Sequence, residues 1–257
     1  MLHNISDLKG YTIRATDGEI GAVQDFYFDD ERWVVRYLIV DTGKWLPGRK
    51  VLLSPFSIAR ADAKQQMVHV KLSKEQIENS PSIEVDKPVS RQYETAYYDY
   101  YGYPYYWGGP NLWGPVAMPG SIVGAPVSHT GMAAAVENES PESNDPHLHS
   151  ADEVMGYYIE ANDGDIGHVK DFIVDDENWA IRYMLVDTKN WWPGRKVVVS
   201  PDWIERVSWS DSRVYVNESR DNIQHAPEYR SNEALTREFE AQLHRHYNRN
   251  PYWDDRV

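Results

Sequence analysis

One stretch of this sequence occurs twice, and the repeat constrains the fold more than any other feature. Residues 33–55 read WVVRYLIVDTGKWLPGRKVLLSP, and residues 179–201 read WAIRYMLVDTKNWWPGRKVVVSP. Between Gly10 and Ile58, about 29 of the 49 positions are identical to the residue 146 positions downstream. Solenoid repeats have shorter periods, of about 20 to 50 residues. The sequence therefore predicts duplication of a whole domain.

The similarity continues past the central stretch into a C-terminal extension, since Tyr106-Trp107 recurs as Tyr252-Trp253. A unit of roughly 105 residues is of ordinary domain size. The expected organisation is repeat 1 at 1–85, its helix and aromatic extension at 86–110, an acidic flexible linker at 111–151, repeat 2 at 152–230, and a C-terminal helix and extension at 231–257.

Composition excludes several classes of function. The 257 residues carry a formal net charge of −14 and no cysteine, which excludes disulfides, thiolate metal sites and cysteine nucleophiles. No Lys or Arg occurs between Arg91 and Lys170. Binding to nucleic acid or anionic lipid requires clustered cations, so we expect neither. Since no run approaches ~20 uncharged apolar residues and no secretory signal is visible, we expect a soluble, cytoplasmic protein.

The strand pattern of each repeat has one irregularity and one unusually apolar strand. In residues 19–28 the apolar residues are three apart rather than two, which predicts a β-bulge at Gly21 and, in repeat 2, at Gly167. The following strand, residues 33–41, is apolar on both faces. A barrel interior would cover one face, and the extension helix, the other repeat or another subunit would cover the second.

Shorter elements complete each repeat. Residues 51–54, 57–60 and 67–72 predict strands, and Ser73 with Gln76 predicts a capping box at the start of a helical turn. Helices are expected from Pro88 to about Tyr101 and over about 232–247, because apolar residues recur there at helical spacing. These helices should cover a face of the barrel.

Polar residues within this framework receive structural interpretations. Arg36 and Arg182 interrupt an apolar strand face, and we expect them to pair with Asp25 and Asp171. The acidic residues 29–31 and 175–177 lack the pattern of a calcium loop. We therefore interpret them as solvated turns and expect no metal site.

The candidate interaction residues lie in two places. The Trp-x-Pro-Gly-Arg-Lys loops either cap the barrel end or bind a partner, because Trp and Arg are enriched at interface hot spots. The aromatic block near residues 97–113 either packs internally or forms an interface with protein or membrane. The candidates are Trp45, Arg49, Trp191, Trp192, Arg195, Tyr97, Tyr101, Tyr105 and Trp107.

Each half resembles the PRC-barrel family. The resemblance rests on the Asp-Gly-x-Ile-Gly-x-Val-x-Asp-Phe run at 17–26 and 163–172, the Arg-Tyr-x-x-Val-Asp strand and the Gly-Arg-Lys-Val-x-x-Ser-Pro stretch. It implies a mainly β fold, with two small, mostly antiparallel β-barrels. In relatives such as the photosynthetic reaction-centre H subunit and a ribosome maturation factor, the barrel is a binding and assembly module without catalytic residues of its own.

The leading hypothesis is a non-enzymatic interaction or assembly module that binds a protein partner or itself, as a homo-oligomer or a pseudo-symmetric monomer. We expect no cofactor. A membrane-associated accessory of photosynthetic electron transfer is an alternative. An enzyme is a less favoured one, and it would use polar residues that both repeats share, namely Asp17/Asp163, Asp25/Asp171, Asp41/Asp187 or Ser54/Ser200.

Overall fold

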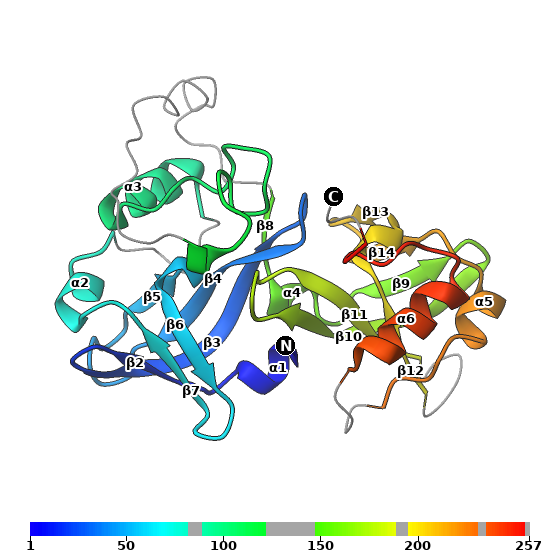
Figure 1. Ribbon diagram of the computed structural model, residues 1–257, viewed down its shortest axis with the longest axis horizontal. Coiled ribbons are helices and arrows are strands. Elements are labelled where there is room, and N and C mark those ends of the chain that lie inside the picture. Colours follow the sequence, from blue (N-terminus) through cyan, green and yellow to red (C-terminus); the bar gives the residue numbers. More distant parts are fainter. Residues whose placement is uncertain (82–88, 122–146, 189–194, 231–234, 255–257) are drawn as a thin grey trace. The chain divides into compact units, whose positions relative to one another are not determined.

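The chain forms two compact units, each built around a seven-stranded sheet (Figure 1). The computed structural model describes residues 1–81, 89–121, 147–188, 195–230 and 235–254. Unit 1 contains Met1, Ile5–Asp152 and Asp175–Ala180, and unit 2 contains Leu2–Asn4, Glu153–Val174 and Ile181–Val257. The division follows the sequence repeat, apart from the short segments that each unit receives from the other half of the chain.

The sheet of unit 1 has the strand order β5-β4-β3-β2-β7-β6. Its strands are β2 (Thr12–Ala15), β3 (Gly18–Asp29), β4 (Val34–Asp41), β5 (Lys50–Leu53), β6 (Ile58–Asp62) and β7 (Met67–Val70). Neighbouring strands are antiparallel except for β2 and β7, which are parallel. This confirms the predicted mostly antiparallel β fold.

Unit 2 repeats the same order, β12-β11-β10-β9-β14-β13. Its strands are β9 (Tyr158–Ala161), β10 (Gly164–Asp175), β11 (Ile181–Asp187), β12 (Lys196–Val199), β13 (Ile204–Ser208) and β14 (Arg213–Val216). Again one pair, β14 with β9, is parallel. Within the described residues the pairings of each sheet form an open path rather than the closed ring that the word barrel suggests.

A seventh strand joins each sheet from the other half of the sequence. Strand β8 (Leu148–Ser150) pairs with β3, and β1 (Leu2–Asn4) pairs with β10. The two added strands lie at matched positions of the repeat, 146 residues apart. Reciprocal exchange of these strands therefore gives both units the same seven-stranded sheet.

The structure differs from the sequence prediction at both ends of the predicted linker, 111–151. Trp113 is fully buried in unit 1, where its Nε1 donates to the Asn178 carbonyl at 2.7 Å. At the other end β8 continues into α4 (Ala151–Val154). The indole buries a large apolar surface, which fixes a segment that composition alone marked as flexible. Residues 122–146 lie outside the described residues.

The helices are short. They are α1 (Ile5–Leu8), α2 (Lys74–Glu78), α3 (Arg91–Tyr101), α5 (Arg220–Gln224) and α6 (Arg237–His246), with 3-10 turns at Pro55–Ser57, Pro119–Ser121 and Pro201–Trp203. Helices α2, α3, α5 and α6 begin at side-chain caps. The predicted capping box of Ser73 and Gln76 is confirmed at α2. Helix α3 begins three residues after Pro88, because Ser90 accepts the backbone N–H of Tyr93.

The core of unit 1 lies on both faces of β4, whose residues 34–40 are all buried. This confirms the predicted double coverage. Helix α3 lies over the sheet (Figure 1), and the Tyr37 ring meets the Tyr97 ring edge-on with centroids 5.4 Å apart. The extension helix is therefore one of the two covers, as one of the sequence-based alternatives proposed.

The predicted bulge is present in both units. Ile13 pairs with Gly21 and Arg14 with Glu19, so that one residue of β3 is extra. A β-carbon on Gly21 would lie 2.0 Å from the Asp41 carbonyl oxygen, and the matched Gly167 has the same restriction. Glycine is required here because the backbone of the next segment approaches too closely for any side chain.

We expect Gly21→Ala to destabilise unit 1 by about 3 kcal/mol or more, because the clash involves backbone atoms and the φ angle of 153° disfavours other residues. Gly120→Ala is the control, since nothing lies within 4 Å of its added methyl group. That variant should stay within about 0.5 kcal/mol of the wild type. Urea unfolding followed by circular dichroism measures both; equal effects would contradict the close approach.

Candidate functional site

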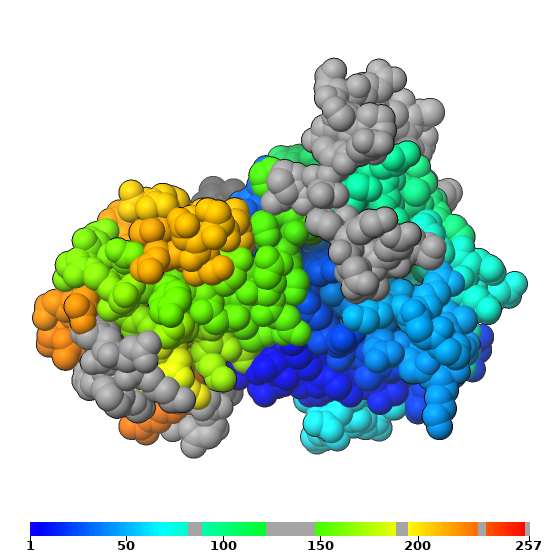
Figure 2. Space-filling model, turned by 180° about the vertical axis from the view of Figure 1, so that it is seen from behind, coloured from blue at the N-terminus to red at the C-terminus, as the bar shows by residue number. Residues whose placement is uncertain are grey.

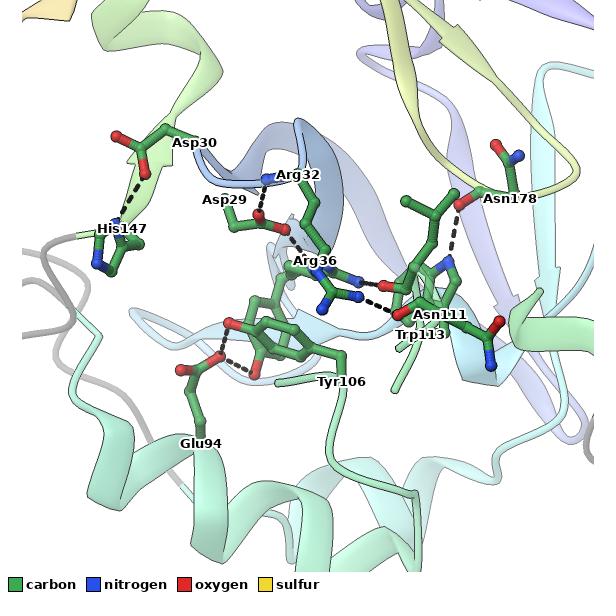
Figure 3. A network of polar contacts seen from close by, with 12 residues as sticks. Asp29, Asp30, Arg32, Arg36, Glu94, Tyr106, Asn111, Trp113, His147 and Asn178 are labelled. Atoms are coloured by element: carbon green, nitrogen blue, oxygen red, sulfur yellow. Dashed lines mark hydrogen bonds and ion pairs between the residues drawn. The ribbon is translucent and has the colours of Figure 1, made fainter. Parts of the chain in front are cut away.

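A buried arginine connects the sheet of unit 1 to its aromatic extension (Figure 3). Arg36 is fully buried, and its Nε donates to Asp29 Oδ2 at 2.5 Å while Nη1 donates to the Leu112 carbonyl at 2.7 Å. The guanidinium lies 4.0 Å from the ring centroid of Tyr106 and 4.7 Å from that of Trp113. Desolvated cation–π contacts of this kind are stabilising, so the aromatic rings cover the charge, while the buried Nη2 has no hydrogen-bond partner among the described residues.

The predicted partner of Arg36 was wrong. Asp25 lies opposite Ile39 in the β3–β4 ladder, and the register shifts beyond Tyr27, which brings Asp29 at the strand end to the arginine. Asp25 instead accepts hydrogen bonds from Ser150 Oγ and from the backbone N–H of Asp152.

The first acidic turn also differs from the solvated turn that we predicted. Asp29 is buried, and Asp30 lies within 3.0 Å of His147 and 3.3 Å of His149. Burial alone would raise the pKa of the Asp30 carboxyl, but hydrogen bonds from His149 and His147 outweigh it and lower that pKa. The turn therefore anchors β8. Among the described residues, no group of three or more His, Asp or Glu side chains is arranged to hold a metal ion.

A buried carboxylate organises the other side of the extension. Glu94 of α3 is fully buried; its Oε1 accepts hydrogen bonds from Tyr37 at 2.7 Å and Tyr106 at 2.9 Å, and its Oε2 lies 2.9 Å from Arg91. Burial and the nearby Glu94 charge raise the pKa of both phenols well above the ordinary value. Both hydroxyls therefore remain donors to the carboxylate.

Unit 2 repeats this arrangement at matched positions. Glu240 accepts hydrogen bonds from Tyr183 at 3.1 Å and Tyr252 at 3.0 Å, with Arg237 at 3.2 Å. Arg182 lies over the Tyr252 ring at 3.8 Å. We call these groups the buried scaffold: Arg36, Tyr37, Glu94 and Tyr106 in unit 1, and Arg182, Tyr183, Glu240 and Tyr252 in unit 2.

Unit 1 also contains a pocket of about 420 Å³ between α2, α3 and the extension. We call it the tyrosine pocket. The surfaces of α2 and α3 are adjacent in unit 1 (Figure 2), and the Tyr100 hydroxyl of α3 donates to the Gln76 carbonyl of α2. Its lining consists of the aromatic residues Phe56, Tyr100, Tyr101 and Tyr103, with Leu72 and Pro119. Lys71 and Gln76 contribute the remaining, polar part.

Stacked rings and hydrogen bonds hold the pocket walls. The rings of Phe56 and Tyr103 stack at 5.2 Å, and those of Tyr103 and Tyr101 at 5.4 Å. The hydroxyls of Tyr100 and Tyr101 both donate to the Gln76 carbonyl, at 2.9 and 3.4 Å. Burial raises the pKa of Tyr101 to about 12, so this hydroxyl stays protonated. The walls are therefore preformed, although Tyr100 is still 43 % exposed.

The lining of the tyrosine pocket is not repeated in unit 2. The residues 146 positions after Phe56, Lys71, Leu72, Tyr100 and Tyr103 are Asp202, Asn217, Glu218, His246 and Arg249. Polar or charged groups thus replace four of the six apolar and aromatic lining residues, whereas Tyr101 recurs as Tyr247. The buried scaffold is common to both units, whereas most of this lining is not repeated at the matched positions of unit 2.

The predicted loop candidates have structural contacts where they are described. Arg49 donates to the carbonyls of Glu78 at 2.6 Å and Ser80 at 2.8 Å, at the end of α2. Trp45 is half-buried beneath Lys74, whose ammonium lies 5.2 Å from its ring centroid. Arg195 donates to the Ala226 carbonyl. Trp191 and Trp192 lie outside the described residues, and a partner-binding role of these loops stays a prediction.

The predicted aromatic candidates separate into interior and pocket residues. Tyr97 is fully buried, where its hydroxyl donates to the Leu52 carbonyl and accepts from the Ser54 N–H. Tyr105 is also buried and stacks on Trp107 at 4.7 Å. Tyr101 alone among these candidates lines the tyrosine pocket.

Sequence reasoning missed the other pocket residues. Phe56, Lys71, Tyr100 and Tyr103 are distant in sequence from one another or lie beside more conspicuous aromatic residues. A usable signal was present: Phe56 and Lys71 recur in repeat 2 as Asp202 and Asn217, and Tyr103 recurs as Arg249.

We expect Arg36→Met to lower the free energy of unfolding by about 3 to 5 kcal/mol, because Asp29 would remain buried without its partner. The matched control is Arg182→Met. Arg182 is only partly buried, so loss of its cation–π contact should cost about 1 to 2 kcal/mol. Urea unfolding measures both, and a smaller effect at Arg36 than at Arg182 would contradict the central role of the buried charge.

Asp25 predicts a pH dependence of stability. Burial raises the pKa of its carboxyl, against the opposing hydrogen bond from Ser150. The folded state therefore takes up a proton more readily than the unfolded state, so this contribution to stability is present at low pH and lost as pH rises through the raised pKa. Asp25→Asn should flatten the fall in unfolding free energy between pH 4 and pH 7; an unchanged slope would contradict this.

Comparison with known proteins agrees with the strand pattern. Residues 2–77 match the family model of the PRC-barrel domain. A stretch of 96 residues is 33% identical to an uncharacterized protein of Deinococcus radiodurans, covering 37% of this chain and 33% of that protein. The match thus spans about a third of the relative's length. No helix among the described residues is long and apolar enough to cross a membrane. The chain carries a PRC-barrel domain at residues 2–77, as the sequence resemblance indicated.

Proposed function

We propose that this protein is a non-enzymatic interaction module whose first unit binds a partner at the tyrosine pocket. One observation carries the proposal: both units retain the buried scaffold, but most of the apolar pocket lining of unit 1 is replaced by polar residues at the matched positions of unit 2. The scaffold supports the fold in either unit. The difference in lining therefore points to a role that belongs to unit 1 alone.

The polar residues shared by both repeats support binding rather than catalysis. Asp17 accepts the backbone N–H of Lys74 at 2.8 Å, and Asp163 accepts that of Arg220 at 2.7 Å. These carboxylates cap matched helices. Catalysis requires a group within reach of a substrate, whereas these groups hold the backbone.

The other shared candidates also have backbone partners. Asp41 accepts the N–H of Gly43 at 2.9 Å, and Ser200 accepts that of Asp202 at 3.3 Å. Ser54 accepts the N–H of Phe56 and is fully buried. Turn and cap formation accounts for their presence in both repeats.

The exposed rim of the pocket supports a protein as the partner. Tyr100 is 43 % exposed, as is Met118, the neighbour of the pocket residue Pro119. Tyrosine and methionine are enriched in the cores of protein interfaces. A partner that covers this rim would remove apolar surface from water, which is the main source of binding free energy.

In-cell cross-linking followed by mass spectrometry tests the proposal with the full chain, Tyr100→Ala and the matched variant His246→Ala. The two side chains contact matched carbonyls, of Gln76 at 2.9 Å and Asn222 at 2.7 Å, so both variants lose a similar internal contact. We expect recovery of the partner to fall at least about fivefold in Tyr100→Ala only, since an interface tyrosine contributes upward of about 1 kcal/mol.

Two outcomes of that experiment redirect or overturn the proposal. Cross-links only between copies of this chain would identify self-association as the interaction. Equal recovery from the wild type and Tyr100→Ala would show that the tyrosine pocket is not the binding surface.

A further inference from the structure

Two polar groups of the tyrosine pocket have no internal partner for their donors. Lys71 is exposed, and its ammonium makes no ion pair or hydrogen bond with any described residue. The hydroxyl of Tyr103 likewise has no hydrogen bond within the described part of the chain. Burial, with Tyr101 and Tyr98 nearby, raises the pKa of Tyr103, so it remains a donor. By contrast, Tyr100 and Tyr101 already donate to Gln76.

The pocket lining carries a positive charge. Lys71 supplies this charge, and no acidic side chain lines the pocket in the described part of unit 1. A cation and a neutral phenol donor in the lining of one pocket favour a ligand that brings a negative charge and hydrogen-bond acceptors.

The shape of the pocket favours a flat apolar group. The rings of Phe56, Tyr103 and Tyr101 form a continuous stack, with spacings of 5.2 and 5.4 Å. An additional ring can stack on or meet the edge of such a series at similar spacing. A volume of about 420 Å³ falls within the range of small-ligand sites.

We propose that the tyrosine pocket binds a planar aromatic group that carries a carboxylate. The ring packs against the stacked walls, while the carboxylate pairs with the Lys71 ammonium and accepts a hydrogen bond from the Tyr103 hydroxyl. This rests on the proposed binding role of unit 1. The same chemistry occurs in a free aromatic acid and in a C-terminal aromatic residue of a partner chain.

Unit 2 provides the internal comparison. Asn217 and Arg249 stand at the positions of Lys71 and Tyr103, and Asp202 stands at that of Phe56. The Trp203 and Tyr247 rings of unit 2 also lie close together, with centroids 4.4 Å apart, but Arg249 is paired with Glu218 at 3.4 Å. The cation of unit 2 is therefore already neutralised, whereas the Lys71 ammonium has no partner among the described residues.

The test uses the full chain and three ligands with one ring system: 1-naphthoate, the neutral 1-naphthamide and the cationic 1-naphthylmethylammonium. Saturation-transfer NMR titrations give the dissociation constants. We expect 1-naphthoate to bind about fivefold more tightly than the amide, which is the upper range for a partly exposed ion pair, and the cation to bind most weakly. Equal affinity for the anion and the amide would overturn the recognition of charge.

Two conservative variants locate the site. Lys71→Gln should weaken 1-naphthoate about fivefold without affecting the amide, and Tyr103→Phe should weaken it about threefold through loss of one hydrogen bond. Asn217→Gln, the change matched to Lys71→Gln in unit 2, should have no effect. Unchanged affinity in Lys71→Gln would overturn the assignment.

Peptides distinguish the two sources of the ligand. Acetyl-Gly-Gly-Phe is compared with its C-terminal amide in the same titration. Preference for the free carboxylate supports recognition of a chain terminus, whereas binding of 1-naphthoate without the peptide assigns the site to a small acid.

Failure of this inference is distinguishable from failure of the proposed function. If neither 1-naphthoate nor the peptide binds, the inference is overturned, even where Tyr100→Ala still loses its cross-linked partner and the interaction role stands. If 1-naphthoate binds while cross-linking is unchanged in Tyr100→Ala, the ligand assignment stands and the protein-partner role is overturned.

Discussion

The buried charge of Arg36 is the constraint on which the rest of unit 1 depends. An isolated guanidinium in a protein interior is strongly unfavourable. Here Asp29 neutralises it, the Leu112 carbonyl accepts one N–H, and the rings of Tyr106 and Trp113 cover its faces. Tyr106 belongs to the aromatic extension, and Leu112 and Trp113 follow directly after it. The extension is therefore required by the strand that contains the arginine, and its position fixes the wall of the pocket beyond it.

The duplication distinguishes the residues that the fold of both units requires from the residues that form a surface in one unit. Matched residues supply the same hydrogen bonds to Glu94 and Glu240, at 2.7 to 3.1 Å, so this requirement is met twice. The exposed residues near the buried scaffold can differ between the two units, because exposed positions tolerate substitution at little cost in stability. The neutral, aromatic Tyr103 and the charged Arg249 occupy equivalent positions of the two repeats. A comparison inside one chain thus distinguishes scaffold from binding surface.

Local patterns made the backbone features predictable, whereas pairing at a distance did not. The bulge at Gly21 and the cap at Ser73 follow from nearby residues, and both were predicted. The partner of Arg36 depended on a register shift beyond Tyr27, which no local pattern indicates. Strand β8 has three residues, too few to show a period. The pocket joins four separate segments, so its composition emerges only from the tertiary fold.

The aromatic extension shows why residue type alone could not decide between packing and binding. Tyr97 and Tyr100 lie on one helix, yet the first is fully buried and the second is 43 % exposed. Helical geometry places residues three apart at similar but not identical angles, so neighbouring tyrosines can serve different surfaces. The tyrosine hydroxyls also differ in whether they have a partner inside the protein. The Tyr97 hydroxyl is satisfied by the backbone of β5, whereas that of Tyr103 is not satisfied by any described residue. The Tyr103 hydroxyl can form with a bound ligand the hydrogen bond that it does not form with any described residue.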